Sequence, residues 1–177
     1  MDHIFTLAQV AEKANEHGIP LWIAVIDFKK AFDSVTHAAI WEALAEQGVE
    51  DEYIQMLQRL YEGQEAFVQT DARSDKFPIN RGTKQGDPVS AILFNAVVEM
   101  FVKKAKQKWV KKKYGFRVDS HSEEDYLTNL RYAEDVLLVA RSLPQSRNML
   151  GDVETEASKV GLKLHPGKTK VLGNAWE

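Results

Sequence analysis

The chain has 177 residues, of which 44% are hydrophobic and 28% charged, with a formal net charge of −3. The length suits one domain with a sizeable core, and the composition is that of an ordinary globular protein. The lack of cysteine excludes a disulfide scaffold and a thiolate metal site. Nucleic-acid-binding domains are usually basic, so the slightly negative net charge argues against nucleic-acid binding. Lysines nevertheless gather at residues 103–113.

No apolar run approaches the roughly 20 residues that span a bilayer, and the start, MDHIFTLAQV, lacks the pattern of a signal peptide. We therefore expect an intracellular protein, in the nucleus or cytoplasm, with no membrane partner.

Segments with helical spacing alternate with segments of strand character. Helices are predicted up to His17-Gly18 and at residues 37–47, 52–61, 89–108 and 145–160. Strands are predicted at residues 21–28, 65–70, 76–79, 116–118, 129–132 and 136–140, with a last one after the Pro166-Gly167 turn. Asp51 and Asp87 are placed to open the helices that follow them. This interleaving predicts an α+β fold, a mixed sheet with helices packed on one face.

Two acids in IDFKKAFDSV, residues 26–35, are candidate metal ligands. Asp27 ends an apolar strand, so its carboxylate emerges where a rigid oxygen ligand for Mg²⁺ is needed. Asp33 follows where the chain turns toward a helix. Taken alone, Asp27 also fits a strand-end residue that faces water, and Asp33 a helix cap.

Adjacent acids also stand between the two apolar runs of NLRYAEDVLLVA, residues 129–140. Glu134 and Asp135 would lie at the tip of a buried hairpin, where like charges repel and desolvation is costly. Together with Asp27 they would form a cluster that divalent cations neutralise. The plainer alternative is a solvated turn, but hairpin turns usually contain glycine and this one does not.

Two further segments favour phosphate groups. In RGTKQGDPVSAILFNAVVEM, residues 81–100, Arg81, Lys84 and a helix N-terminus attract anions, and the glycines allow close backbone approach. In LHPGKTK, residues 164–170, Lys168 can neutralise or protonate a leaving phosphate. Alone, the first fits an ordinary loop and cap, and the second a solvated lysine.

The lysine run at residues 103–113 has the same two interpretations. Lys111, Lys112 and Lys113 suit a nucleic-acid backbone, or they are a solvated helix end. Trp109 within the run can stack on a base, although packing is the simpler role.

In this order and spacing, four stretches resemble successive motifs of the reverse transcriptase palm domain, with the closest likeness to non-LTR (LINE-type) retrotransposons. They are IDFKKAFDSV, RGTKQGDPVSAILFN, LRYAEDVLLVA and GLKLHPGKTKVL. The resemblance covers nearly the whole chain. It implies a single palm-like domain over residues 1–177, with a mixed or antiparallel sheet, partial fingers and no thumb.

The implied activity is that of an RNA-directed DNA polymerase. A primer 3′-OH, paired to an RNA template, attacks the α-phosphate of a dNTP with the help of Mg²⁺, or of Mn²⁺. The resemblance assigns the metal to Asp27, Glu134, Asp135 and the main-chain carbonyl of Phe28, and the protonation of pyrophosphate to Lys168.

The resemblance also implies the substrate contacts. Phe32 matches the bulky residue that blocks a ribose 2′-OH. Gln85 and Gly86 match the loop that meets the incoming nucleotide and the template, and Tyr132 and Ala133 belong to the matching hairpin on the substrate side.

Two departures from the family pattern stand out. Glu134 occupies a position where the family has Asp, and the fingers and thumb regions of the parent polyprotein are not found in the chain. A relic that binds nucleic acid without catalysis is therefore an alternative. A metal-dependent nuclease or phosphotransferase is a third, which the Phe32 and Gln85 positions disfavour because a nuclease needs no sugar gate.

Overall fold

A computed structural model describes residues 2–84, 86–118, 126–133 and 135–174. Its helices are α1 (Asp2–Glu16), α2 (Ala31–Ser34), α3 (His37–Glu46), α4 (Asp51–Tyr61), α5 (Pro88–Lys111) and α6 (Leu143–Lys159). Its strands are β1 (Trp22–Ile26), β2 (Glu65–Ala66), β3 (Phe77–Pro78), β4 (Phe116–Arg117), β5 (Tyr126–Leu127), β6 (Asn129–Tyr132), β7 (Asp135–Ala140) and β8 (Lys170–Gly173). The predicted α+β class is confirmed. Within the residues described, no helix is both long and apolar enough to cross a membrane.

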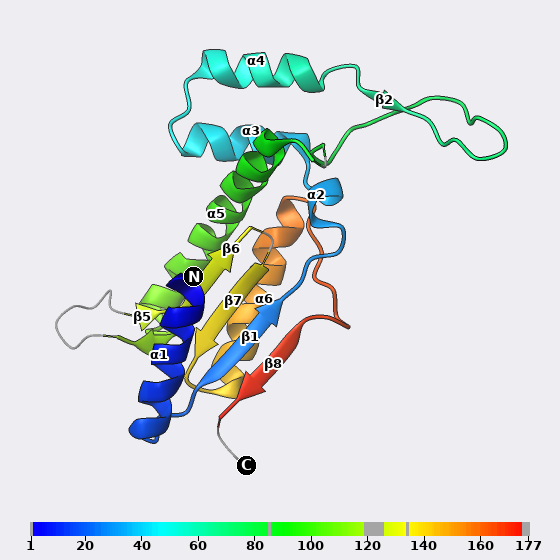
Figure 1. The fold of residues 1–177 in the computed structure, drawn as a ribbon. Helices are drawn as coiled ribbons and strands as arrows, with labels where there is room; N and C mark the ends of the chain where they lie inside the picture. Colours follow the sequence, from blue (N-terminus) through cyan, green and yellow to red (C-terminus); the bar gives the residue numbers. More distant parts are fainter. Residues whose placement is uncertain (1, 85, 119–125, 134, 175–177) are drawn as a thin grey trace.

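The centre of the fold is an antiparallel sheet with the strand order β6-β7-β1-β8 (Figure 1). Alternate residues of the inner strands β1 and β7, such as Ile26 and Leu138, are fully buried in one cluster with apolar side chains of α5 and α6. Val139 points to the opposite face, where α1 packs over it. The expected helix layer is therefore α5 and α6, and α1 covers part of the other face.

The first residues of α2, α4 and α5 show which of the three predicted helix caps are correct. Asp87 caps α5 as predicted, because its carboxylate accepts a hydrogen bond from the Val89 amide at 2.9 Å and Pro88 occupies the first turn. The prediction for Asp51 is wrong: the chain is extended at Glu50, so the helix begins one residue earlier and Asp51 lies in its first turn. The cap interpretation of Asp33 is also wrong, since α2 starts after Lys30 and contains Asp33.

Strands β2 and β3 form an arm that extends away from the sheet (Figure 1). The predicted strands at 65–70 and 76–79 shrink there to a pairing of Glu65 with Pro78 and Ala66 with Phe77. The apolar residues Phe67 and Val68 are exposed. In the described part of the chain, neither buried cluster includes a residue of the arm, so no core holds longer strands in register, and proline donates no ladder hydrogen bond.

Part of the lysine run holds α5 against its neighbours. Lys104 on α5 pairs with Glu42 at 2.9 Å and with Glu46 at 3.0 Å, both on α3. The hydrogen bonds that Lys104 donates to these carboxylates raise its pKa. This lysine therefore links α5 to α3 through ion pairs.

A second tie joins α5 to α6. Trp109 is fully buried and donates from Nε1 to the Asp152 carboxylate at 3.1 Å, so its predicted packing role is confirmed. Lys108 reaches Glu156 at 2.9 Å, and Lys159 reaches the same carboxylate at 2.6 Å. Glu156 is only 5% exposed, and these partners supply the charge that a buried carboxylate requires.

Candidate active site

Two acids meet at one end of the central sheet. The register of β1 with β7 ends at Ile26 opposite Val136, so Asp27 directly follows the last paired residue of β1, and Asp135 directly precedes the residue paired with it on β7. The apolar strands are fixed by burial, and they hold both carboxylates at this edge with little freedom of the backbone.

The carboxylate of Asp27 has little compensation for its burial. Its Oδ2 atom is buried and accepts no hydrogen bond from the residues that the structure describes, although the side chain as a whole is 32% exposed. The Lys168 ammonium lies 3.7 Å from Oδ2, close enough for an ion pair but too far for a hydrogen bond. An unsatisfied buried acceptor costs about 1–3 kcal/mol, so this oxygen suits a cation ligand.

A short turn delivers Lys168 to this position. The His165 amide donates to the Asp27 main-chain carbonyl at 2.8 Å, and the His165 carbonyl accepts from the Lys168 and Thr169 amides at 3.0 and 2.9 Å. Leu164 bridges Phe28 in the same segment. The loop before β8 is thereby fastened to the end of β1.

The hairpin between β6 and β7 places a non-glycine residue in an unusual conformation. Tyr132 pairs with Asp135, and Ala133 has a φ of +49°, in the left-handed region. A left-handed alanine is costly, and such strain gathers at functional sites. The Tyr132 side chain is 75% exposed beside it. Glu134, the other turn residue, lies outside the described residues.

Phe32 forms one wall of a pocket of about 450 Å³. Its half-buried ring packs on Phe94 with a centroid distance of 4.6 Å. The other lining residues are Lys84, Gly86, Asp87, Pro88, Ser90 and Ala91. Gln85, predicted for the same loop, is among the residues that the structure does not describe.

The loop that lines this pocket is bound closely to α2. The Thr83 amide donates to the Phe32 carbonyl, and the Gly82 amide donates to the Val35 carbonyl, both at 2.7 Å. Gly82 has a φ of +88°, and a Cβ there would stand 3.0 Å from the Asp33 backbone. Only glycine allows this approach, so Gly82 sets the position of the loop.

Arg81 and Lys84 flank a neighbouring pocket of about 510 Å³, which Asp33 also lines. All three side chains are exposed. Asp33 therefore sits on the side of the loop and not in the pair of acids.

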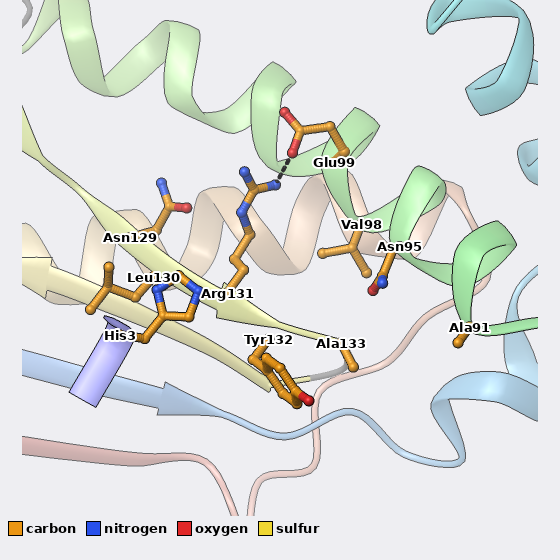
Figure 2. A pocket seen from close by; sticks show the side chains of 10 residues that line it. All are labelled: His3, Ala91, Asn95, Val98, Glu99, Asn129, Leu130, Arg131, Tyr132 and Ala133. Carbon is orange, nitrogen blue, oxygen red and sulfur yellow. Dashed lines mark ion pairs between the residues drawn. The ribbon is translucent and has the colours of Figure 1, made fainter. Parts of the chain in front are cut away.

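Another pocket, of about 560 Å³, lies between α5 and β6 (Figure 2). Ala91 belongs to both this pocket and the Phe32 pocket, so the two adjoin. Arg131 on β6 pairs with Glu99 on α5 at 2.6 Å across it. Sequence reasoning missed this pair, because nothing local in the sequence links the two residues.

Lys111, Lys112 and Lys113 lie at the far end of α5 from the acids (Figure 1). The helix has 24 residues, so this end is about 36 Å from its start beside Phe32. The structure thus separates them from Asp27, Asp135 and Lys168, which it brings together.

The described residues suit a divalent cation in part. They include no group of three or more acidic or histidine side chains placed to hold a metal, since Glu134 lies outside them. Asp27 and Asp135 nevertheless supply hard oxygen donors at adjoining strand ends, and the unbonded Oδ2 of Asp27 fits a metal ligand.

The family described as reverse transcriptase (RNA-dependent DNA polymerase) matches residues 1–175. The chain belongs to this family. Family members generally use divalent metals, in keeping with the paired acids.

The curated relatives confirm the resemblance to non-LTR retrotransposons. The chain is 31% identical over 166 residues to the Retrovirus-related Pol polyprotein of the type-2 retrotransposable element R2DM of Drosophila melanogaster, which covers 93% of this chain and 15% of that protein. It is also 31% identical over 155 residues to the corresponding polyprotein of a type-1 R2 element of Nasonia vitripennis, covering 86% of this chain and 14% of the relative. The chain thus spans about one seventh of the length of these two polyproteins.

Solved telomerase structures share the fold. Apo telomerase of Candida tropicalis, truncated from its C-terminal domain, matches with a TM-score of 0.72 at 18% identity, over 99% of this chain and 35% of that one. Telomerase of the same species with the TWJ fragment of telomeric RNA matches with a TM-score of 0.69 at 17% identity, over 98% of this chain and 29% of that one.

Proposed function

We propose that this chain is the palm region of an RNA-directed DNA polymerase, which joins a dNTP to a primer 3′-OH on an RNA template. The observation that carries the proposal is the pair of strand ends at which Asp27 and Asp135 adjoin, with Oδ2 of Asp27 buried and unbonded. Membership of the reverse transcriptase family supports it.

In this proposal Asp27, Asp135 and Glu134 hold Mg²⁺, with Mn²⁺ as a substitute. The main-chain carbonyl of Phe28 is an additional ligand, and it takes no part in the backbone hydrogen bonds that join Asp27 and Lys29 to residues 163–165. The metal, when bound, would activate the primer hydroxyl and stabilise charge on the leaving group.

The remaining residues orient the substrates. Phe32 closes the side of its pocket where the sugar would lie, so a 2′-OH would meet the ring. Gln85 and Gly86 contact the nucleotide and template, while Tyr132 and Ala133 approach the substrates from the hairpin.

Cations around the site would serve the phosphates. Arg81 and Lys84 attract template and nucleotide phosphates, and Lys168 protonates or neutralises the departing pyrophosphate. Lys111, Lys112 and Lys113 contact the nucleic-acid backbone at a distance from the chemistry.

We further propose that the chain acts within a longer polyprotein whose fingers and thumb regions complete the grip on template and primer. The small share of the R2 polyproteins that it covers supports this arrangement. The test is primer extension on an RNA template with those regions joined to the chain. Extension that Asp27→Asn and Asp135→Asn each reduce by at least about 100-fold is expected, since a ligand misplaced by about 1 Å already costs that factor. Undiminished extension by both variants would overturn the proposal.

A second candidate is a family member that binds nucleic acid without extending it. Glu134 favours this function, because its carboxylate stands one methylene farther from the chain than the aspartate of the family pattern. Binding of a primer–template with no extension in Mg²⁺ or Mn²⁺, by the polyprotein form, would identify it.

A further inference from the structure

The ion pair between Lys168 and Asp27 unites two groups with separate tasks in the proposed reaction. Lys168 Nζ lies 3.7 Å from Oδ2 of Asp27, the buried oxygen that accepts no hydrogen bond. The lysine side chain is 65% exposed, so its ammonium remains hydrated while it faces the carboxylate. The contact is a loose one on an oxygen that a metal would bind.

We propose that Lys168 is an internal counter-cation of Asp27, and that a divalent metal must displace it to bind. Metal binding and release of the Lys168 ammonium are then one coupled event. This inference rests on the proposed metal site.

The backbone around Lys168 is fixed while its side chain is free to move. Hydrogen bonds from the His165 amide to Asp27, and from the Lys168 and Thr169 amides to His165, hold the turn in place at 2.8–3.0 Å. The flexible four-carbon stem of lysine can swing about this anchor. The turn therefore keeps the ammonium within reach of Asp27 without committing it to that position.

Competition follows from charge and space. A magnesium ion sits about 2.0–2.1 Å from its oxygen ligands, closer to Oδ2 than the ammonium at 3.7 Å, so the two positive charges would compete for the same oxygen. The metal ion and the ammonium are both positive and repel each other, so only one of them can pair closely with Oδ2 at a time. By thermodynamic linkage, the free energy by which Lys168 stabilises the metal-free site is lost from the free energy of metal binding.

The exchange gives Lys168 a role at each stage. Before metal binds, the ammonium offsets the repulsion between Asp27 and Asp135. After metal binds, the ammonium is released close to the site, where it can meet the leaving phosphate. A lysine still held by Asp27 could not do this.

The test measures Mn²⁺ binding to the 177-residue chain by electron paramagnetic resonance. Lys168→Gln should lower the Kd by up to about fivefold, the factor that corresponds to roughly 1 kcal/mol for an exposed ion pair. Lys168→Arg, which keeps the charge, should bind nearly as the parent does. Lys170→Gln is the matched control, since it removes the same charge from an exposed lysine two residues away.

A second readout follows the lysine itself. With the lysine amines carrying ¹³C-methyl labels, the Lys168 signal should move on Mg²⁺ addition to the position that it already has in Asp27→Asn. Three outcomes would overturn this inference while leaving the metal site intact. The Kd for Mn²⁺ could be equal in the parent and in Lys168→Gln, or Lys170→Gln could lower the Kd as much as Lys168→Gln does. The Lys168 signal could also stay in place at metal saturation. Failure of the parent and every variant to bind Mn²⁺ would overturn the metal site as well.

Discussion

Replacing Phe32 by alanine tests the sugar wall directly. The ring closes one side of a pocket of about 450 Å³ and packs on Phe94 at 4.6 Å. Without the ring, the space next to a ribose 2′-carbon would be open to a hydroxyl. An apolar pocket rejects an analogue that merely adds a hydroxyl by on the order of 100-fold. We expect Phe32→Ala to lower the preference for dNTP over rNTP by about this factor, mainly through better use of rNTP.

The stability cost should leave the variant folded. Truncating a fully buried phenylalanine to alanine lowers the free energy of unfolding by about 3–5 kcal/mol. Of this loss, about 0.5–1.5 kcal/mol comes from the contact between the two aromatic rings. Phe32 is only half-buried, so about 1–2 kcal/mol is expected. This is a minor part of the about 5–15 kcal/mol by which domains are usually stable.

The assay is single-nucleotide primer extension with the polyprotein form, comparing kcat/KM for a dNTP and the matching rNTP. Phe94→Leu is the control, because Phe94 is fully buried under Phe32 and does not line the pocket. An unchanged preference in Phe32→Ala would refute the wall. Equal relaxation in both variants would instead attribute the effect to loosened packing.

Three further changes address other parts of the molecule. Glu134→Asp should raise extension with Mg²⁺ by up to about 100-fold and by less with Mn²⁺, which tolerates looser ligand geometry, because a shift near 1 Å can cost that factor. Neutralising Lys111, Lys112 and Lys113 should reduce the slope of log affinity against log salt by about 0.7–0.9 for each phosphate that the protein no longer neutralises. Glu156→Gln should lower the free energy of unfolding by about 1–3 kcal/mol near pH 7, as measured with urea. The hydrogen bond from Lys159, and then that from Lys108, holds the pKa of Glu156 below its usual 4.5, while burial opposes them. The stabilisation is therefore fully present above the usual pKa, and it is lost as the pH falls through the lowered pKa of the folded state.

Each of these changes has an outcome that contradicts its reasoning. No gain from Glu134→Asp would mean that the longer side chain is tolerated or that activity is limited elsewhere. Equal salt slopes would make the lysines a solvated helix end. A Glu156→Gln deficit that is the same near pH 3 as near pH 7 would assign it to packing instead of charge, and Glu154→Gln, an exposed change on the same helix, is the control.

The sequence predicted the sheet and its helices well, because the central strands are continuous apolar runs and the helices repeat apolar residues at helical spacing. The strand expected at residues 21–28 is found at Trp22–Ile26, and the hairpin strands at Asn129–Tyr132 and Asp135–Ala140. The same pattern predicted the arm poorly. Phe67 and Val68 have strand character, but they are exposed, and composition alone does not reveal that no core lies beneath them.

The candidate site was only partly accessible from sequence. Motif order indicated that Asp27 and the hairpin acids belong together, and the register of β1 with β7 makes Asp27 and Asp135 neighbours. The ion pair of Lys168 with Asp27 joins residues 141 positions apart (168 − 27) through a turn whose hydrogen bonds involve backbone atoms only. Motif order assigned both residues to one reaction site, but it did not predict that Lys168 pairs with Asp27.

The lysine run shows how one basic segment divides into different functions. Lys104 and Lys108 join α5 to α3 and α6, so they are unavailable to a nucleic acid without loss of those ties. The lysines at the end of the helix lie about 36 Å from its start, a length that roughly ten base pairs of double-stranded DNA span at about 3.4 Å each. An RNA–DNA duplex has A-form geometry with a smaller rise, so it needs more than ten base pairs to span the same length.

If those lysines touch a primer–template duplex held at Asp27, they should require a duplex longer than about ten base pairs. Shortening the duplex below this length should abolish the effect of neutralising Lys111, Lys112 and Lys113 on the salt slope. The effect of neutralising Arg81 and Lys84, which lie beside the site, should persist. A duplex-length dependence that is the same for both sets would show that the far end of α5 does not follow the duplex, and that its charge serves another contact.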